Sequence, residues 1–179
     1  MRKLAPILTL LALSGPSLAA PAAPPALGRP ATVDEVARAD ISIDPSGAGL
    51  PKGSGSVAQG ATLYTAKCQS CHGANGVGGP ADRLTGGLGT LATKAPIKTV
   101  NSFWPYATTV FDYTRRAMPV TAPQSLTADE AYALTAYILS VDGVVLKDAV
   151  LDQDSLPKVQ MPNREGFVSY LKASLRPKK

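Results

Sequence analysis

The sequence predicts an all-α fold in which one compact domain lies between two extensions. Three stretches, 57–67, 106–116 and the one between Thr127 and Gly143, combine helical spacing of apolar residues with a capping residue or a proline at their start. No stretch sustains the alternation of apolar and polar residues that a half-buried strand requires. Both flanking regions hold prolines and scattered apolar residues, so neither predicts a second core.

The first residues have the three parts of a secretory signal peptide. Arg2 and Lys3 supply positive charge, residues 4–13 form an apolar run, and Ser17-Leu18-Ala19 ends in the small residues that a signal peptidase reads. The alternative is a transmembrane anchor, but the run is too short to cross about 30 Å of hydrocarbon. We expect residues 1–19 to be removed on export, leaving a periplasmic protein without a transmembrane anchor.

Charge argues against one broad class of function. The chain has 18 basic and 13 acidic side chains, a net charge of +5. Two of the basic residues lie in the signal peptide and four lie in the last eight residues, which leaves 12 basic and 13 acidic side chains in the body. A nearly neutral body with a short basic tail is not the pattern of a nucleic-acid-binding protein.

Residues 20–55 are predicted to form a linker and extension rich in proline and glycine. The stretch 20–30 has too many prolines for a regular helix or strand. A short helix is expected at 32–39, where Thr32 and Glu35 can form a capping box. The stretch 44–56 is rich in Gly, Pro and Ser and is predicted to be a loop.

The compact domain is predicted over residues 56–142. Its first residue is a serine, a suitable N-cap for a helix over 57–67, in which Gly60, Tyr64 and Cys68 lie on one face. Residues 81–101 show no dominant period and are expected to be loop with short helical pieces.

Two further helices complete the domain. Pro105 suits the first turn of a helix over 106–116, which Met118-Pro119 ends; its expected apolar face is Val110, Phe111, Tyr113 and Thr114. The last helix has the clearest signals, since Thr127 and Glu130 form a capping box and Gly143 follows its end. Its apolar stripe is Leu134, Tyr137, Ile138 and Val141.

Residues 143–179 are predicted to be a wrapping extension rather than a second core. Apolar residues in both extensions, such as Ile41 and Phe167, either cover the domain or bind another surface. Docking to a partner is better supported for residues 27–55, whereas wrapping is at least as well supported for residues 143–150.

Cys68-Gln69-Ser70-Cys71-His72 is the C-x-x-C-H pattern of covalent haem attachment. On a helical turn, thiols at i and i+3 lie on one face, where they can add to the two vinyl groups of a porphyrin. The imidazole at i+4 projects from the same face toward the iron. The motif contains both cysteines and the one histidine of the chain. We therefore predict one covalently attached haem c, with His72 as an iron ligand.

Three other interpretations of these cysteines are weaker. A thioredoxin-type redox pair would follow a strand in a βαβ unit, and no strand is predicted there. A structural zinc site needs four ligands, and the sequence has no further Cys or His. A disulfide across two residues would be strained and would leave the adjacent histidine unexplained.

The sixth iron ligand is expected to be a methionine. With one histidine, bis-His ligation within the chain is impossible, and Met1 leaves with the signal peptide. Met118 and Met161 remain, each followed by a proline; either could also be a core residue. Met118 is favoured because it lies between two helices of the domain. His/Met ligation raises the reduction potential and fills both axial positions.

Several of these features together resemble class I cytochrome c over residues 56–142: Gly60, Tyr64, the C-x-x-C-H motif, Met118-Pro119 and Leu134-x-x-Tyr137. The resemblance implies the class I cytochrome c fold, with crossed N- and C-terminal helices around one haem. In that family a small glycine lets the two helices approach at the aromatic residue of the partner helix.

The resemblance also suggests residues around the haem. It implies that the carbonyl of Pro80 accepts the Nδ1 proton of His72 and orients the imidazole. Trp104 and Tyr106 are either core aromatics or donors to a haem propionate. The site predicted from the sequence therefore consists of Cys68, Cys71, His72, Met118, Pro80, Trp104 and Tyr106.

A narrower resemblance concerns GLPKGSGSVAQG, TVNSFWPYATTVFDYTRRAMP, QSLTADEAYALTAYIL and MPNREGF. These stretches look like the cytochrome subunit of the sulfur-oxidising (Sox) sulfane dehydrogenase and like cytochromes that accompany molybdenum sulfite dehydrogenases. The resemblance implies a molybdenum partner that oxidises a sulfur compound. The Sox subunit usually has a second haem domain, and this sequence has no second C-x-x-C-H motif.

The sequence thus predicts an electron-transfer protein, not an enzyme, that passes single electrons from a molybdenum sulfite or sulfane dehydrogenase to a downstream cytochrome or oxidase. One alternative is a general electron shuttle to a terminal oxidase without a dedicated partner. Another is a haem enzyme or gas sensor in which Met118 is displaceable.

Overall fold

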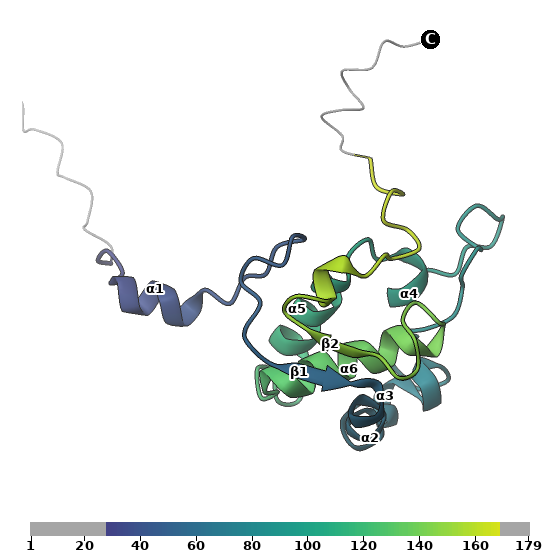
Figure 1. Cartoon of the computed structure of the whole chain (residues 1–179), viewed down its shortest axis with the longest axis horizontal. Coiled ribbons are helices and arrows are strands. Elements are labelled where there is room, and N and C mark those ends of the chain that lie inside the picture. The colour runs from purple at the N-terminus through teal and green to yellow at the C-terminus, as the bar shows by residue number, and fades with distance from the viewer. Residues whose placement is uncertain (1–27, 169–179) are drawn as a thin grey trace, which may run out of the picture.

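The computed structural model describes residues 28–168, which form helices with one short strand pair (Figure 1). This confirms the predicted all-α class. In chain order the elements are α1 (Val33–Ala39), β1 (Ser54–Ser56), α2 (Val57–Lys67), α3 (Gln69–His72), η1 (Ala74–Gly76), α4 (Val100–Phe103), α5 (Ala107–Ala117), α6 (Ala128–Val141), β2 (Val150–Asp152) and η2 (Leu156–Lys158). The predicted signal peptide and the basic tail lie outside the described residues. Within residues 28–168, no helix is both long and apolar enough to cross a bilayer.

Helices α2 and α6 cross at Gly60, as the resemblance implied. A Cβ atom added to Gly60 would lie 1.9 Å from the carbonyl oxygen of Ala133 and 2.7 Å from the Cβ of Tyr137, so only glycine permits this approach. Beside the crossing, the rings of Tyr64 and Tyr137 pack with their centroids 5.0 Å apart.

Helix α6 runs through the core. Its predicted capping box is present, since the Thr127 hydroxyl accepts from the backbone N–H of Glu130 and the Glu130 carboxylate accepts from that of Thr127. On its inner face Tyr132 packs against Phe111 of α5, with ring centroids 4.3 Å apart, and both side chains are fully buried. Helix α6 contacts both α2 and α5, so it is the common support of the domain.

The C-terminal extension packs on the same core. Strands β1 and β2 pair antiparallel, and Leu151, Leu156 and Met161 are buried in the core that α5 and α6 form. No strand is predicted here from the sequence, because three residues are too few to show an alternating pattern. Helix α5 begins one residue later than predicted: Tyr106 is its N-cap, and Pro105 precedes the helix.

The N-terminal extension has two parts. Helix α1 has the predicted capping box, yet none of its residues is buried, and it stands away from the body (Figure 1). From Ile41 onward the chain lies against the compact domain. The carbonyl of Ile41 accepts from Nη2 of Arg116 at 3.1 Å, and the carbonyl of Pro51 accepts from the hydroxyl of Tyr132 at 2.8 Å. Only the α1 part is free of the domain.

Candidate haem site

The C-x-x-C-H motif lies where α2 passes into α3. Cys68 is the C-cap of α2, and its carbonyl accepts from the backbone N–H of His72 at 3.0 Å, so the motif forms one helical turn. Both cysteines are free thiols; Cys68 is half-buried and Cys71 is exposed. Before attachment, burial raises the pKa of the Cys68 thiol. Two unpaired thiols on one face fit covalent attachment to a porphyrin.

The imidazole of His72 is oriented by a backbone carbonyl. Its Nδ1 lies 2.7 Å from the carbonyl oxygen of Asp82. A carbonyl can only accept, so Nδ1 carries the proton and Nε2 keeps its lone pair for a metal. This arrangement fits an axial haem ligand.

The predicted acceptor, Pro80, was wrong by two residues. The backbone N–H of Ala81 donates to the carbonyl of Cys71 at 2.8 Å, which fixes the chain just before Asp82. The carbonyl of Asp82, the residue after Ala81, then reaches His72, while Pro80 is exposed. Because every residue has a carbonyl, no side chain in the sequence marks which one is used.

The two methionines have different surroundings. Met118 is the C-cap of α5, is half-buried, and donates its N–H to the carbonyl of Thr114 at 3.1 Å. Met161 is only 3% exposed and belongs to the hydrophobic core. A thioether enclosed by core side chains is not open to a metal, so the packing favours Met118.

Apolar side chains near the candidate ligands are exposed. Val77, Tyr113 and Val120 are 38%, 49% and 71% exposed, and each lies within five residues of His72 or Met118 in the sequence. Large apolar side chains are costly to leave in water, and a flat porphyrin could cover them. Tyr113 was not among the predicted site residues. It was expected on the apolar face of helix α5 with Val110, Phe111 and Thr114, but only those three are buried.

Trp104 and Tyr106 lie beside α5. Both are half-buried; Trp104 packs edge-on against Tyr113 with ring centroids 5.6 Å apart, and the guanidinium of Arg164 lies 5.1 Å from the centre of the Tyr106 ring. Neither side chain makes a described hydrogen bond, so the indole N–H and the phenol remain free to donate. Arg116, by contrast, forms an ion pair with Asp112, in which Nη2 lies 2.7 Å from Oδ1.

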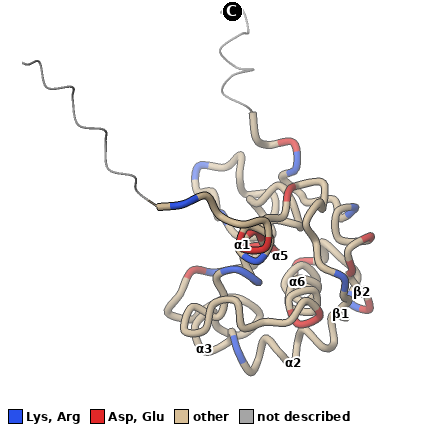
Figure 2. Tube along the Cα trace, turned by 90° about the vertical axis from the view of Figure 1, so that its left-hand side faces the viewer, with Lys and Arg blue, Asp and Glu red and all other residues tan. Residues whose placement is uncertain are grey.

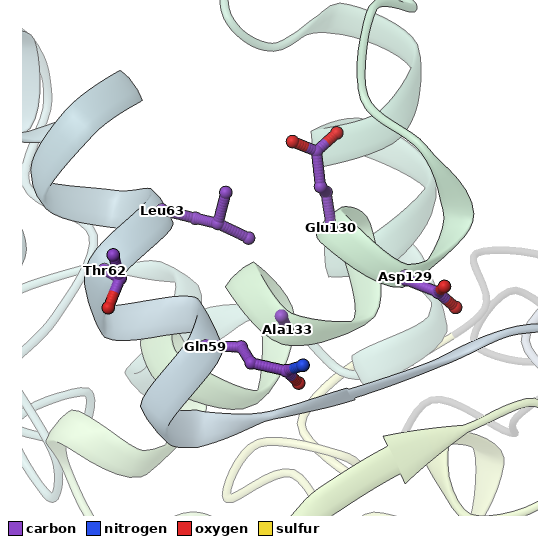
Figure 3. Close-up of a pocket in the computed structure, with 6 residues that line it drawn as sticks. All are labelled: Gln59, Thr62, Leu63, Asp129, Glu130 and Ala133. Carbon is purple, nitrogen blue, oxygen red and sulfur yellow. The ribbon is translucent and has the colours of Figure 1, made fainter.

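An open pocket lies elsewhere, between α2 and α6. Its lining residues are Gln59, Thr62, Leu63, Asp129, Glu130 and Ala133, and Leu63 points into it from α2 (Figure 3). On one side Glu130 pairs with Lys67 at 2.9 Å. The pocket contains no predicted site residue, so we do not assign the haem to it.

Comparison with known families and structures decides the class. The cytochrome c family matches residues 57–142. A chain in the crystal structure of the sulfane dehydrogenase SoxCD from Paracoccus pantotrophus is 39% identical, with a TM-score of 0.74 and coverage of 86% of this chain and 80% of that chain. A search of curated proteins gave no match.

The chain belongs to the class I c-type cytochromes. The cytochrome therefore carries covalently attached haem c and has an electron-carrier role. The SoxCD match covers far more than residues 57–142, so the similarity includes much of the two extensions.

Proposed function

We propose that this cytochrome is a periplasmic carrier that takes single electrons from a molybdenum-containing sulfite or sulfane dehydrogenase. It then passes them to a downstream cytochrome or oxidase of the respiratory chain. The observation that carries the proposal is the geometry of His72, whose Nδ1 is bonded to a carbonyl and whose Nε2 is free, within the one attachment motif of the sequence.

Each site residue has a distinct role in this proposal. Cys68 and Cys71 would hold the haem through thioether bonds, and His72 and Met118 would be the iron ligands. The haem supplies a one-electron redox couple. With His72 and Met118 as ligands the chain itself would supply both iron ligands and leave no position for substrate, so the proposed role is to carry electrons without catalysing a reaction.

Trp104 and Tyr106 are proposed donors to a haem propionate. The free indole N–H and phenol hydroxyl described above support this role. The edge-on contact with Tyr113 holds the indole of Trp104 against α5, the helix that ends at Met118.

The proposed partner rests on similarity. The related chain comes from a sulfane dehydrogenase, and the similarity extends into both flanking segments. A dehydrogenase that oxidises a sulfur compound must pass on its electrons, and a one-haem carrier accepts them singly. Export through the signal peptide would place the cytochrome beside such an enzyme in the periplasm.

The proposal is tested by stopped-flow reduction with a purified molybdenum sulfite or sulfane dehydrogenase and its substrate. We expect the oxidised cytochrome to be reduced within the turnover time of the enzyme, and no reduction by substrate alone. Equal reduction by unrelated soluble donors, with no preference for the dehydrogenase, would instead support a general shuttle to a terminal oxidase.

A further inference from the structure

The loop that follows the attachment motif is held to α6 at two points. Near its start, the hydroxyl of Tyr137 donates to Oδ1 of Asn75 at 2.9 Å. Just beyond its end, the backbone N–H of Gly86 donates to Oδ2 of Asp142 at 2.6 Å. The carbonyl that accepts from His72 lies between these two points, so helix α6 fixes the segment that orients the imidazole.

Asn75 joins the two ends of this loop. Its φ of +54° lies in the left-handed region, which Asn adopts more readily than most non-glycine residues. While its side chain contacts Tyr137, its backbone carbonyl accepts from Oγ1 of Thr85 at 2.6 Å. Thr85 is only 2% exposed and comes three residues after Asp82. The bond from Thr85 therefore closes the segment 75–85, which contains the Asp82 carbonyl.

We propose that Asn75 is a positioning residue that holds the Asp82 carbonyl against Nδ1 of His72 and thereby sets the reduction potential of the cytochrome. The inference rests on the proposed ligation of iron by His72. A carbonyl that accepts firmly from Nδ1 makes the imidazole a stronger electron donor, which favours ferric iron. Loosening the loop weakens this bond and shifts the equilibrium toward the ferrous form.

Three substitutions loosen the loop without removing a ligand. Thr85→Val keeps the shape of the side chain and removes the bond to Asn75. Tyr137→Phe keeps the ring against Tyr64 and removes the bond to Asn75 Oδ1. Asn75→Gly keeps the backbone conformation and removes the side-chain acceptor.

Two control substitutions make the same chemical change on α6 away from the loop. Tyr132→Phe removes a hydroxyl that donates to the Pro51 carbonyl at 2.8 Å. Thr135→Val removes a buried hydroxyl that donates to the Ala131 carbonyl at 2.7 Å. Both controls cost stability, but neither touches the loop that bears Asp82.

The measurements are the reduction potential of each holoprotein and the NMR resonance of the His72 Nδ1 proton in the ferrous state. We expect the three loop variants to shift the redox equilibrium toward reduction by roughly threefold to tenfold, where tenfold corresponds to 59 mV for one electron. The Nδ1 resonance should move with the potential. The Tyr137→Phe, Asn75→Gly double variant should shift no further than its larger single variant, and the controls should keep the wild-type values.

Two outcomes overturn the inference. One is a loop-variant potential that is unchanged or lowered; the other is a shift of equal size in the controls, which would show a general effect of lost stability. The wild-type spectrum distinguishes failure of the proposed ligation from failure of the positioning role. If wild type lacks a low-spin haem, the proposed ligation fails; if it has one and the loop variants keep its potential, the positioning role alone fails.

Discussion

At the scale of single residues, His72 and the two methionines decide what the haem can do. The hydrogen bond from His72 Nδ1 to the Asp82 carbonyl, 2.7 Å long, favours the tautomer that is protonated at Nδ1 and leaves Nε2 available to a metal. Met118 is half-buried and is a candidate ligand, whereas Met161 has the same thioether but is 3% exposed and is a core residue.

Substitution of Met118 should change the spectrum and the reduction potential, whereas substitution of Met161 should change only the stability. Met118→Ala should abolish the weak sulfur-to-iron absorption band of the oxidised protein and lower the reduction potential, because it removes the distal thioether. Met161→Ala should leave both unchanged but lower the free energy of unfolding by about 2–5 kcal/mol, because it opens a cavity in the core. Absorption spectra, potentiometry and chemical unfolding measure these effects, and the reverse pattern would refute the assignment.

Tyrosine ionisation should limit stability at high pH. Burial raises the pKa of Tyr64 to about 12, with a smaller contribution from Tyr137, and burial likewise raises the pKa of Tyr132 to about 12. In the unfolded chain these phenols ionise near the ordinary value of 10.0. Above pH 10 the unfolded state therefore releases protons first, and the free energy of unfolding should fall between pH 10 and about pH 12.

The variant Tyr64→Phe tests the contribution of one phenol. It should be less stable than wild type at neutral pH, because it loses the bond from the hydroxyl to the Gly73 carbonyl. Its stability should then fall less steeply above pH 10. Urea unfolding across this pH range measures both effects, and identical slopes in the two proteins would contradict the assignment to Tyr64.

At the scale of elements, the crossing of α2 and α6 is the contact most sensitive to substitution. Gly60→Ala would place a methyl group 1.9 Å from the Ala133 carbonyl oxygen, so the helices must separate, at a cost of about 2–3 kcal/mol. The control Ala58→Gly, on the exposed face of α2, should cost only about 1 kcal/mol of helix propensity. Thermal or denaturant unfolding gives both values, and equal losses would show that the crossing tolerates a larger residue.

Helix α1 should contribute nothing to the stability of the domain. Its residues are all unburied, and Val33 and Val36 are 84% and 53% exposed. Deletion of residues 28–40 should leave the melting temperature unchanged. The expectation that the N-terminal segment docks a partner stays a prediction: it requires the deleted protein to be reduced more slowly by the dehydrogenase, whereas an unchanged rate would leave α1 without that role.

The comparison of sequence with structure shows which elements can be predicted. Helices with a cap and an apolar stripe were found with nearly the right bounds, because capping boxes such as those of Thr32 and Thr127 are local signals. The pairing of β1 with β2 was not found, because it joins residues almost one hundred positions apart through three-residue strands. The carbonyl of Asp82 was missed for a related reason, since backbone groups have no sequence signature.

At the scale of the whole molecule, one core supports both the haem-binding residues and the C-terminal extension. Basic and acidic residues are dispersed along the visible trace (Figure 2), in agreement with the nearly neutral composition of the body. With no large field of one sign over residues 28–168, association of this body with a redox partner should depend only weakly on ionic strength, so contact surfaces matter more than electrostatic steering.

We propose that this cytochrome carries electrons through a haem whose iron is bound by two of its own residues, His72 and Met118. The most direct test is the absorption spectrum of the purified ferrous holoprotein before and after equilibration with carbon monoxide. We predict an unchanged spectrum, because His72 and Met118 leave no open position on the iron. A carbon monoxide-induced shift of the main haem band in the wild-type protein would contradict the account and favour a haem enzyme or gas sensor with a displaceable Met118.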